Sequence, residues 1–261
     1  MFISYPQDML LLVRQLFRRS NCGRNNFPFR HSLIRNSLKG MIMSISELLS
    51  QFGDKYLLAL ITTYKLTICS FGLALIIGVI ITVMRISPIT PLKVVADLYV
   101  QIFRNIPGAS LLIVLVYALP YLNIVLSYYT CVLTATTLIP SAFCSEYLMS
   151  GMNTISPGQI EASRSLGMTF MQTIRNVVLP QAIRSSVLPL TNLMVSTMLT
   201  TAIASQVPLN PMELTGIVSY INTHAVGGIT AFVISAFLYC GTAVIIGQVG
   251  NLIDRKVRIL R

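Results

Sequence analysis

Long stretches without a charged side chain dominate this sequence of 261 residues. No charge occurs over the nineteen positions from Leu66 to Met84, or over the forty-one positions between Arg104 and Glu146. At about 1.5 Å of rise per residue, nineteen helical residues cover roughly the 30 Å hydrocarbon core of a bilayer, and forty-one suffice for two helices. Only 10% of the residues are charged and 54% are hydrophobic. A soluble domain of this length needs more polar surface, so we expect an all-α protein that crosses a membrane several times.

Five membrane-spanning helices are predicted from these runs. The first should begin near Tyr56. The second should start around Lys93 and bend at Pro107, because proline removes a helical hydrogen bond and crowds the preceding turn. The turn signal at residues 120–123 (Pro-Tyr-Leu-Asn) then separates the second span from the third. The last two spans are expected at residues 184–206 and 228–250.

The distribution of positive charge predicts the orientation of these spans. The chain has 19 Lys and Arg against 8 Asp and Glu. These positive residues cluster beside apolar runs and do not alternate with aromatic residues, which favours a membrane protein over a nucleic-acid binder. With five spans, one side collects most of the core's positive residues and is therefore predicted to be cytoplasmic: Arg85, Lys93, Arg164, Arg175, Arg184 and the tail at 254–258.

The first forty residues do not fit this orientation, because their seven Lys and Arg would lie outside. The sequence from Met43 reads like a natural start. We therefore expect residues 1–42 to be an N-terminal extension, either disordered or the product of a misplaced start codon, and residues 43–261 to form the membrane domain. An extra apolar segment at residues 9–17 is the alternative, but it is too short to span a bilayer.

A polar segment from Ser156 to Gly167 interrupts the apolar runs. Ser156 and Gln159 have the spacing of a capping box at a helix start, and Gly167 can supply a left-handed helix stop. Thr169 and Gln172 repeat the capping pattern. The spacing predicts two short helices that meet at a glycine.

Such a corner suits a partner that accepts a helix in a groove, although an amphipathic connector lying on lipid headgroups would have the same pattern. The side chains expected to provide apolar contact are Ile160, Leu166, Met168, Met171 and Ile174.

The same segment resembles a known signature. Glu161-Ala162-Ser163, followed by Gly167 and, nine residues later, Val-x-Leu-Pro at 177–180, is similar to the EAA signature of ABC transporter permeases (E-A-A, three residues, G, nine residues, I-x-L-P). The resemblance covers residues 43–261. Further segments resemble the polar amino acid uptake subfamily: residues 62–67, 103–107 and 179–184, and Asn192 within Leu-x-Asn.

The resemblance implies the MetI-like fold of type I ABC importers, with about five transmembrane helices and a cytoplasmic coupling-helix loop. Carried over, Glu161, Ala162, Ser163 and Gly167 would form the contact with the ATPase. Ser163 departs from the usual second alanine but keeps a small side chain. The chain has no Walker A glycine loop, so ATP hydrolysis is expected in a separate subunit.

The implied partners are cytosolic ABC ATPase subunits, a second permease subunit that is either identical or different, an extracytoplasmic amino-acid-binding protein and the lipid bilayer. The implied location is the bacterial cytoplasmic membrane, crossed several times. Residues 104–107 and 203–205 look most like those of glutamate-type permeases, so the expected cargo is glutamate or a related polar amino acid.

Polar residues inside the spans are candidates for the substrate path, because polar groups are costly there and often functional. They are Arg104, Asn105, Glu146, Asn192, Ser196 and Thr200. Each has a structural alternative: the charged residues can lie at the cytoplasmic interface, and Ser and Thr often pack helices together. Met149 and Leu199-Thr200 stand where the subfamily usually has Arg and Lys-Asp or Lys-Asn, so an unlike partner would have to supply those groups.

Two other classes of function are considered. A lipid-modifying intramembrane enzyme needs acids or histidines clustered at one membrane face, whereas Glu146 is the one acid predicted inside a span. A passive channel would not require the cytosolic corner. The five cysteines are scattered without a C-x-x-C pair, so no metal site, cofactor or catalytic residue is predicted.

Overall fold

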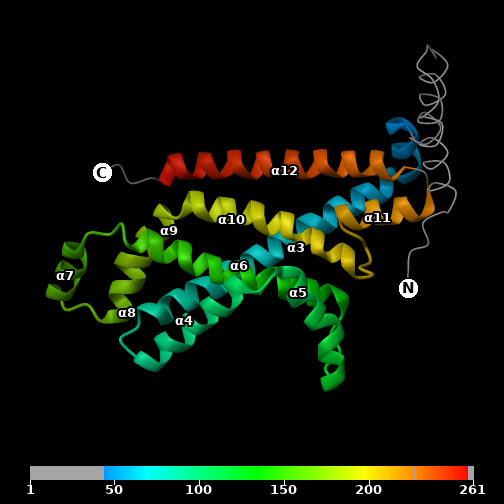
Figure 1. The fold of residues 1–261 in the computed structure, drawn as a ribbon. Coiled ribbons are helices and arrows are strands. Elements are labelled where there is room, and N and C mark those ends of the chain that lie inside the picture. Colours follow the sequence, from blue (N-terminus) through cyan, green and yellow to red (C-terminus); the bar gives the residue numbers. More distant parts are fainter. Residues whose placement is uncertain (1–43, 226, 258–261) are drawn as a thin grey trace, which may run out of the picture. The chain divides into compact units, whose positions relative to one another are not determined.

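The computed structural model describes residues 44–225 and 227–257, so the expected extension over residues 1–42 lies outside the described residues. Within the described part the chain is helical and contains no strand. Its longer helices (Figure 1) are α3 (Ile45–Ile86), α4 (Thr90–Asn105), α6 (Tyr128–Met152), α10 (Val187–Thr200), α11 (Leu214–His224) and α12 (Gly228–Val257). The shorter ones are α5 (Gly108–Ile113), α7 (Pro157–Ser165), α8 (Phe170–Thr173) and α9 (Leu179–Ser185). Two π-helical segments, η1 (Val114–Ala118) and η3 (Ile174–Val178), and two 3₁₀ segments, η2 (Leu119–Leu122) and η4 (Thr201–Gln206), connect them.

Three described elements are long and apolar enough to cross a bilayer: α3, the continuous run of α10 with η4, and α12. The bent pair formed by α4 and residues 108–122 makes a fourth if it is counted as one span. Helix α6 has 25 residues and is about 37 Å long at 1.5 Å per residue, but it is not among the helices that are apolar enough to be counted as a span. Twelve of its residues are buried, against five of 30 in α12, so α6 exposes little surface to lipid. The predicted all-α membrane fold is confirmed.

Helix α3 begins earlier than the prediction of a first span from Tyr56. The Ser44 hydroxyl accepts a hydrogen bond from the Glu47 amide at 3.2 Å, and the Glu47 carboxylate accepts one from the Ser44 amide at 3.0 Å. This capping box fixes the start of a helix of 42 residues, about 63 Å long. The helix is therefore longer than a bilayer requires.

The second predicted span breaks sharply at the expected proline. The direction of the chain changes by 101° between α4 and residues 108–122, with Ile106 and Pro107 in extended conformations at the break. The predicted turn after it is also present, because η2 is followed by Asn123 in a left-handed conformation with a φ of +60°. Ser127 then caps α6 by accepting from the Thr130 amide.

Both π-helical segments stand directly before a Leu-Pro pair. In η1 the amide of Leu119 donates to Val114, and in η3 the amide of Leu179 donates to Ile174. Proline removes a helical hydrogen bond and crowds the carbonyl four residues earlier, and the wider π turn relieves that clash. The chain therefore remains helical from η3 into α9, although Pro180 is the second residue of α9.

Small side chains let α3 and α6 pack closely. A Cβ on Gly78 of α3 would lie 2.6 Å from the Cβ of Cys144 on α6. Close to this crossing, the hydroxyl of Thr82 donates to that of Ser145 at 3.1 Å. Glycine contacts and hydroxyl pairs of this kind are typical of helix packing in membranes.

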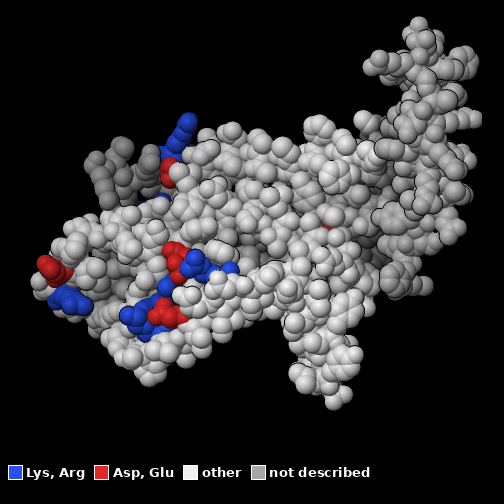
Figure 2. All heavy atoms as spheres, viewed as in Figure 1, with Lys and Arg blue, Asp and Glu red and all other residues white. Residues whose placement is uncertain are grey.

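Several Lys and Arg residues lie together at the end of the bundle that contains α4 and α7. On the face drawn in Figure 2, Lys and Arg lie over α4, α7 and the end of α12. Such clustering of positive residues is the signal from which the cytoplasmic side is predicted.

Candidate functional site

The polar corner between α6 and α9 is built by local hydrogen bonds. Helix α7 stops at Gly167, whose φ is +73°. The amide of Gly167 donates to Arg164 at 2.9 Å, and the amide of Met168 donates to Ser163 at 3.2 Å. These two bonds form a Schellman motif, which requires the left-handed residue that glycine supplies. The predicted glycine stop is confirmed.

The start of α8 also follows the prediction. The Thr169 hydroxyl accepts from the Gln172 amide at 3.4 Å, and the Gln172 side chain accepts from the Thr169 amide at 2.8 Å. The second capping box is therefore present, and α8 continues through η3 into α9.

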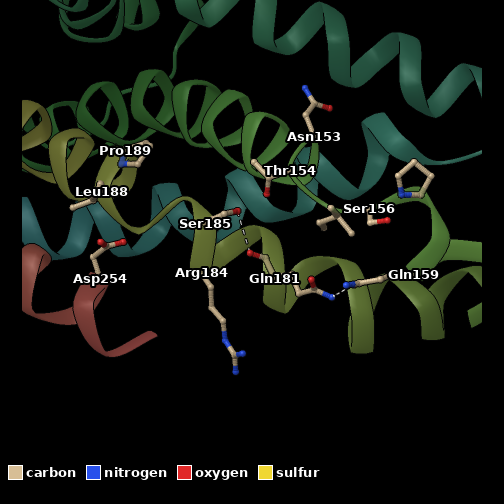
Figure 3. Close-up of a pocket in the computed structure, with 12 residues that line it drawn as sticks. Asn153, Thr154, Ser156, Gln159, Gln181, Arg184, Ser185, Leu188, Pro189 and Asp254 are labelled. Carbon is tan, nitrogen blue, oxygen red and sulfur yellow. Dashed lines mark hydrogen bonds between the residues drawn. The ribbon is translucent and has the colours of Figure 1, made fainter. Parts of the chain in front are cut away.

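The predicted capping box at Ser156 is wrong. Its side chain makes no capping hydrogen bond, although Ser156 is the N-cap residue of α7 and its carbonyl accepts from the Gln159 amide at 3.0 Å. The Gln159 side chain has another partner, because its Oε1 accepts from Nε2 of Gln181 on α9 at 2.6 Å (Figure 3). This bond ties the first turn of α7 to α9.

The four predicted coupling residues differ in exposure. Glu161, Ala162 and Gly167 are exposed, whereas Ser163 is only 3% exposed. The Ser163 hydroxyl donates to Ile160 at 2.7 Å and lies 3.1 Å from the hydroxyl of Thr173 on α8. Ser163 therefore holds the two helices together and does not present a surface to a partner.

The expected apolar contact surface is smaller than predicted. Leu166 and Met171 are exposed, but Ile160 and Met168 are half-buried. Ile174 is buried in a cluster with neighbouring aliphatic residues of the corner, so it is not available to a partner. The corner is thus anchored through its own small core.

A cavity of about 890 Å³ lies beside the corner, between the loop after α6, the helices α9 and α10 and the end of α12. In Figure 3 Arg184 extends away from the other labelled side chains, while Asp254 approaches from α12. Ser185 closes one wall by donating to Gly151 of α6 at 3.1 Å. The corner is therefore connected to α6 and α9 by direct hydrogen bonds.

A second group of charged residues joins three helices. Arg85 of α3 contacts Asp97 of α4 at 2.8 Å and Glu146 of α6 at 3.0 Å, and Arg104 of α4 contacts Glu146 at 3.4 Å. The Arg85 side chain is 14% exposed and that of Arg104 is 39% exposed. With two positive and two negative members, the cluster is neutral. The sequence prediction included Arg104 and Glu146 but missed Arg85 and Asp97 as their neighbours.

The remaining residues predicted to line the substrate path make their own local contacts and do not join the charged cluster. Asn105 binds back to its own helix, donating to Gln101 at 2.6 Å. Asn192, Ser196 and Thr200 follow each other at intervals of four on α10, and therefore share one face of that helix.

Thr200 lies beside the break in the second span. A Cβ on Gly108 would be 3.7 Å from the Thr200 methyl group. In the described structure no hydrogen bond or ion pair connects Asn192 or Ser196 to the charged cluster.

One buried acid escaped the sequence prediction. Glu213 is 1% exposed and accepts hydrogen bonds from the amides of Thr215 and Gly216, each at 2.6 Å, and from the Tyr239 hydroxyl at 2.9 Å. Burial raises the pKa of this carboxyl, although the hydrogen bonds act in the opposite direction. Its position directly before α11 as a helix N-cap was the only available signal.

Among the described residues, no group of three or more His, Cys, Asp or Glu side chains could hold a metal ion. Four cysteines are described and all are free: Cys69, Cys131, Cys144 and Cys240.

Comparison with known proteins gives similarities along most of the chain. The sequence pattern of a family described as "binding-protein-dependent transport system inner membrane component" matches residues 74–259. The glutamate transport system permease protein GluC of Corynebacterium glutamicum is 33% identical over 183 residues, 65% of this chain and 80% of that protein. The L-cystine transport system permease protein TcyB of Bacillus subtilis is 31% identical over 196 residues, 75% of this chain and 83% of that protein.

Solved structures are similar as well. An amino acid ABC transporter crystallised with histidines has a chain that is 28% identical and superposes with a TM-score of 0.72, covering 82% of this chain and all of that one. The methionine ABC transporter MetNI, in an inward-facing conformation, gives a TM-score of 0.65 at 23% identity over 83% of this chain and all of that one, which is a likeness of fold.

Proposed function

The chain belongs to the family of binding-protein-dependent transport system inner membrane components, and from this premise we propose that it is the membrane-spanning permease subunit of an ABC importer for polar amino acids. The proposed cargo is glutamate or a related amino acid. Support for this choice comes from the relatives, which are named as glutamate and L-cystine permeases. Family membership favours transport over an intramembrane lipid-modifying enzyme or a passive channel.

The observation that carries the proposal is the exposed corner formed by α7 and α8. Its outer surface presents Glu161, Ala162 and Gly167, and its two helices are fixed by the Schellman motif and by the second capping box. Because the corner is already held in one conformation, no binding free energy is spent on ordering it when a partner pushes against it. It would fit a cleft on a cytosolic ATPase subunit, which binds and hydrolyses ATP.

The internal bonds of the corner give such a push a route into the membrane. Gln159 of α7 is hydrogen-bonded to Gln181 of α9. Ser185, the last residue of α9, and Ser186, which follows it, donate hydrogen bonds to backbone carbonyls of α6. The Ser186 hydroxyl donates to Tyr147, one residue after Glu146. Closure of the ATPase subunits would thus move α6 and α10 together. In the assembled importer this movement would open the substrate path to one side of the membrane and close it to the other.

The cluster around Glu146 is the proposed contact for the cargo. An amino acid carries a carboxylate and an ammonium group at neutral pH, and Arg104 and Glu146 have the complementary charges 3.4 Å apart. Arg85 holds Glu146 from the other side at 3.0 Å. The substrate carboxylate would replace Glu146 on Arg104, and the freed Glu146 would face the ammonium group. Asn105 and the α10 face with Asn192, Ser196 and Thr200 would line the path.

The complete importer would contain a second permease, identical or different, and an external amino-acid-binding protein, in the bacterial cytoplasmic membrane. A different second permease would explain why Met149 and Leu199 stand where charged residues are usual in the subfamily. Residues 43–261 would form the membrane domain.

The test is ATP-dependent uptake of labelled glutamate by the assembled transporter in vesicles. Glu161→Lys should abolish uptake and release the ATPase during purification. Asp54→Lys makes the same charge change at an exposed position near the start of α3 and should leave both intact. If Glu161→Lys retains the ATPase and transports normally, the proposed coupling role is wrong. Competition by unlabelled amino acids then tests the cargo separately.

A further inference from the structure

The hairpin that runs from the end of η1 to the first turn of α6, residues 117–129, has a surface that the proposed function does not use. The ten residues from Tyr121 to Thr130 are all exposed. Tyr121 is 89% and Val125 is 79% exposed. The segment projects away from the other helices beyond α5 (Figure 1). It contains no charged residue.

Its side chains are poorly suited to bulk water. Leu122, Ile124, Val125 and Leu126 are all exposed, as are the neighbouring tyrosine rings. Single exposed apolar residues are common on proteins, but a contiguous patch marks a contact with another apolar phase or partner.

Its backbone is equally unsuited to the hydrocarbon core. The amides of Val125, Leu126 and Ser127 make no hydrogen bond to any described residue. Unpaired amides in lipid are so costly that irregular backbone does not occur there exposed to acyl chains. The hairpin therefore needs an environment that offers polar partners to its backbone amides and apolar contact to its side chains.

The tyrosines identify the environment that provides both. The hairpin carries Tyr117, Tyr121, Tyr128 and Tyr129, which are all exposed and whose hydroxyl groups make no hydrogen bond to a described residue. Tyrosine is enriched at membrane interfaces, where the ring meets acyl chains and the hydroxyl meets headgroups and water. A second protein would instead have to supply partners for four phenols and three amides.

We propose that residues 117–129 bind the headgroup region of the lipid bilayer and anchor the broken second span at the membrane surface. Since the hairpin is uncharged, the contact should not depend on anionic lipid. The orientation of the proposed importer would place the hairpin in the outer leaflet, and that placement rests on the proposed function. The contact with lipid does not rest on it.

The chain contains no tryptophan, so one introduced tryptophan reports its own depth. The test uses the full chain carrying Tyr121→Trp in phosphatidylcholine vesicles that contain lipids brominated near the headgroup or near the end of the acyl chain. Phe237→Trp on α12 is the matched control, because Phe237 is 75% exposed and lies within a spanning helix. Fluorescence of the tryptophan at 121 should be lost more with the shallow bromolipid, and that of the control more with the deep one.

Two results would overturn the proposal: loss only to iodide in the water, or no loss to bromolipids at either depth. A benzophenone amino acid at position 121 of the assembled transporter provides a second measurement. It should cross-link to lipid, and a cross-link to the second permease would overturn the proposal. Neither measurement requires uptake, so failure of the transport function would be recognised separately.

Discussion

Replacing Gly167 by alanine isolates the backbone requirement of the corner. A Cβ at this position would meet nothing within 4 Å, so no steric contact accompanies the change. The φ of +73° is nevertheless unfavourable for any residue with a Cβ. Gly167→Ala should therefore weaken the Schellman motif alone.

The expected magnitude follows from two opposing effects. The left-handed conformation costs alanine about 1–2 kcal/mol. Alanine also restricts the unfolded chain, which offsets about 0.4–1 kcal/mol. The net loss of about 0–1.6 kcal/mol, centred at about 0.8 kcal/mol, corresponds to about a fourfold increase in local opening. Asparagine tolerates this conformation, so Gly167→Asn should cost less than Gly167→Ala.

The same loop offers a control of opposite sign. Gly158 lies in the first turn of α7 with no positive φ, and a Cβ there would have its nearest neighbour at 3.7 Å. Gly158→Ala should stabilise the corner by about 0.4–1 kcal/mol, slowing local opening two- to fivefold. The pair of variants thus separates the effect of conformation from that of adding a methyl group.

Amide hydrogen exchange measures this opening directly. The amide of Met168, which donates to Ser163, should exchange faster in Gly167→Ala and slower in Gly158→Ala. Equal exchange in both variants, or faster exchange in Gly167→Asn than in Gly167→Ala, would refute the reasoning.

Three further predictions concern the rest of the chain. Double-mutant cycles on thermal unfolding should give a larger coupling for Arg85 with Glu146, the shorter and less exposed ion pair, at about 1–3 kcal/mol, than for the more exposed Arg104 with Glu146, at about 0.2–1 kcal/mol; equal values would contradict this order. Because the pKa of Glu213 is raised by burial, wild-type stability relative to Glu213→Gln should fall as pH rises from the ordinary value of 4.5 through the raised pKa, and a difference independent of pH would contradict the assignment. A chain that starts at Met43 should insert into the membrane and support uptake, and loss of either would show that residues 1–42 are required.

Local signals in the sequence predicted much of the fold. The glycine stop, the second capping box and the broken span at Pro107 each depend on a few adjacent residues, and each is present in the structure. The capping box at Ser156 was wrong because Gln159 binds a residue 22 positions later in the chain. Local spacing cannot reveal such a competitor.

The charged cluster shows the same limit for the candidate site. Arg104 and Glu146 were recognised singly, as polar residues in apolar runs. Their common neighbour Arg85 comes from α3, and the ion pairs depend on how α3, α4 and α6 pack. Glu213 was overlooked because its burial results from packing against α12, which the sequence of the loop does not encode.

The proposed coupling role requires that the corner between α7 and α8 contacts a cytosolic ATPase. It is tested most directly by placing a benzophenone amino acid at position 161 of the assembled transporter and irradiating it in the membrane. We expect a cross-link to the ATPase subunit from position 161 and none from position 121, at the lipid-facing hairpin. Absence of an ATPase cross-link at 161, or equal yields from both positions, would contradict it.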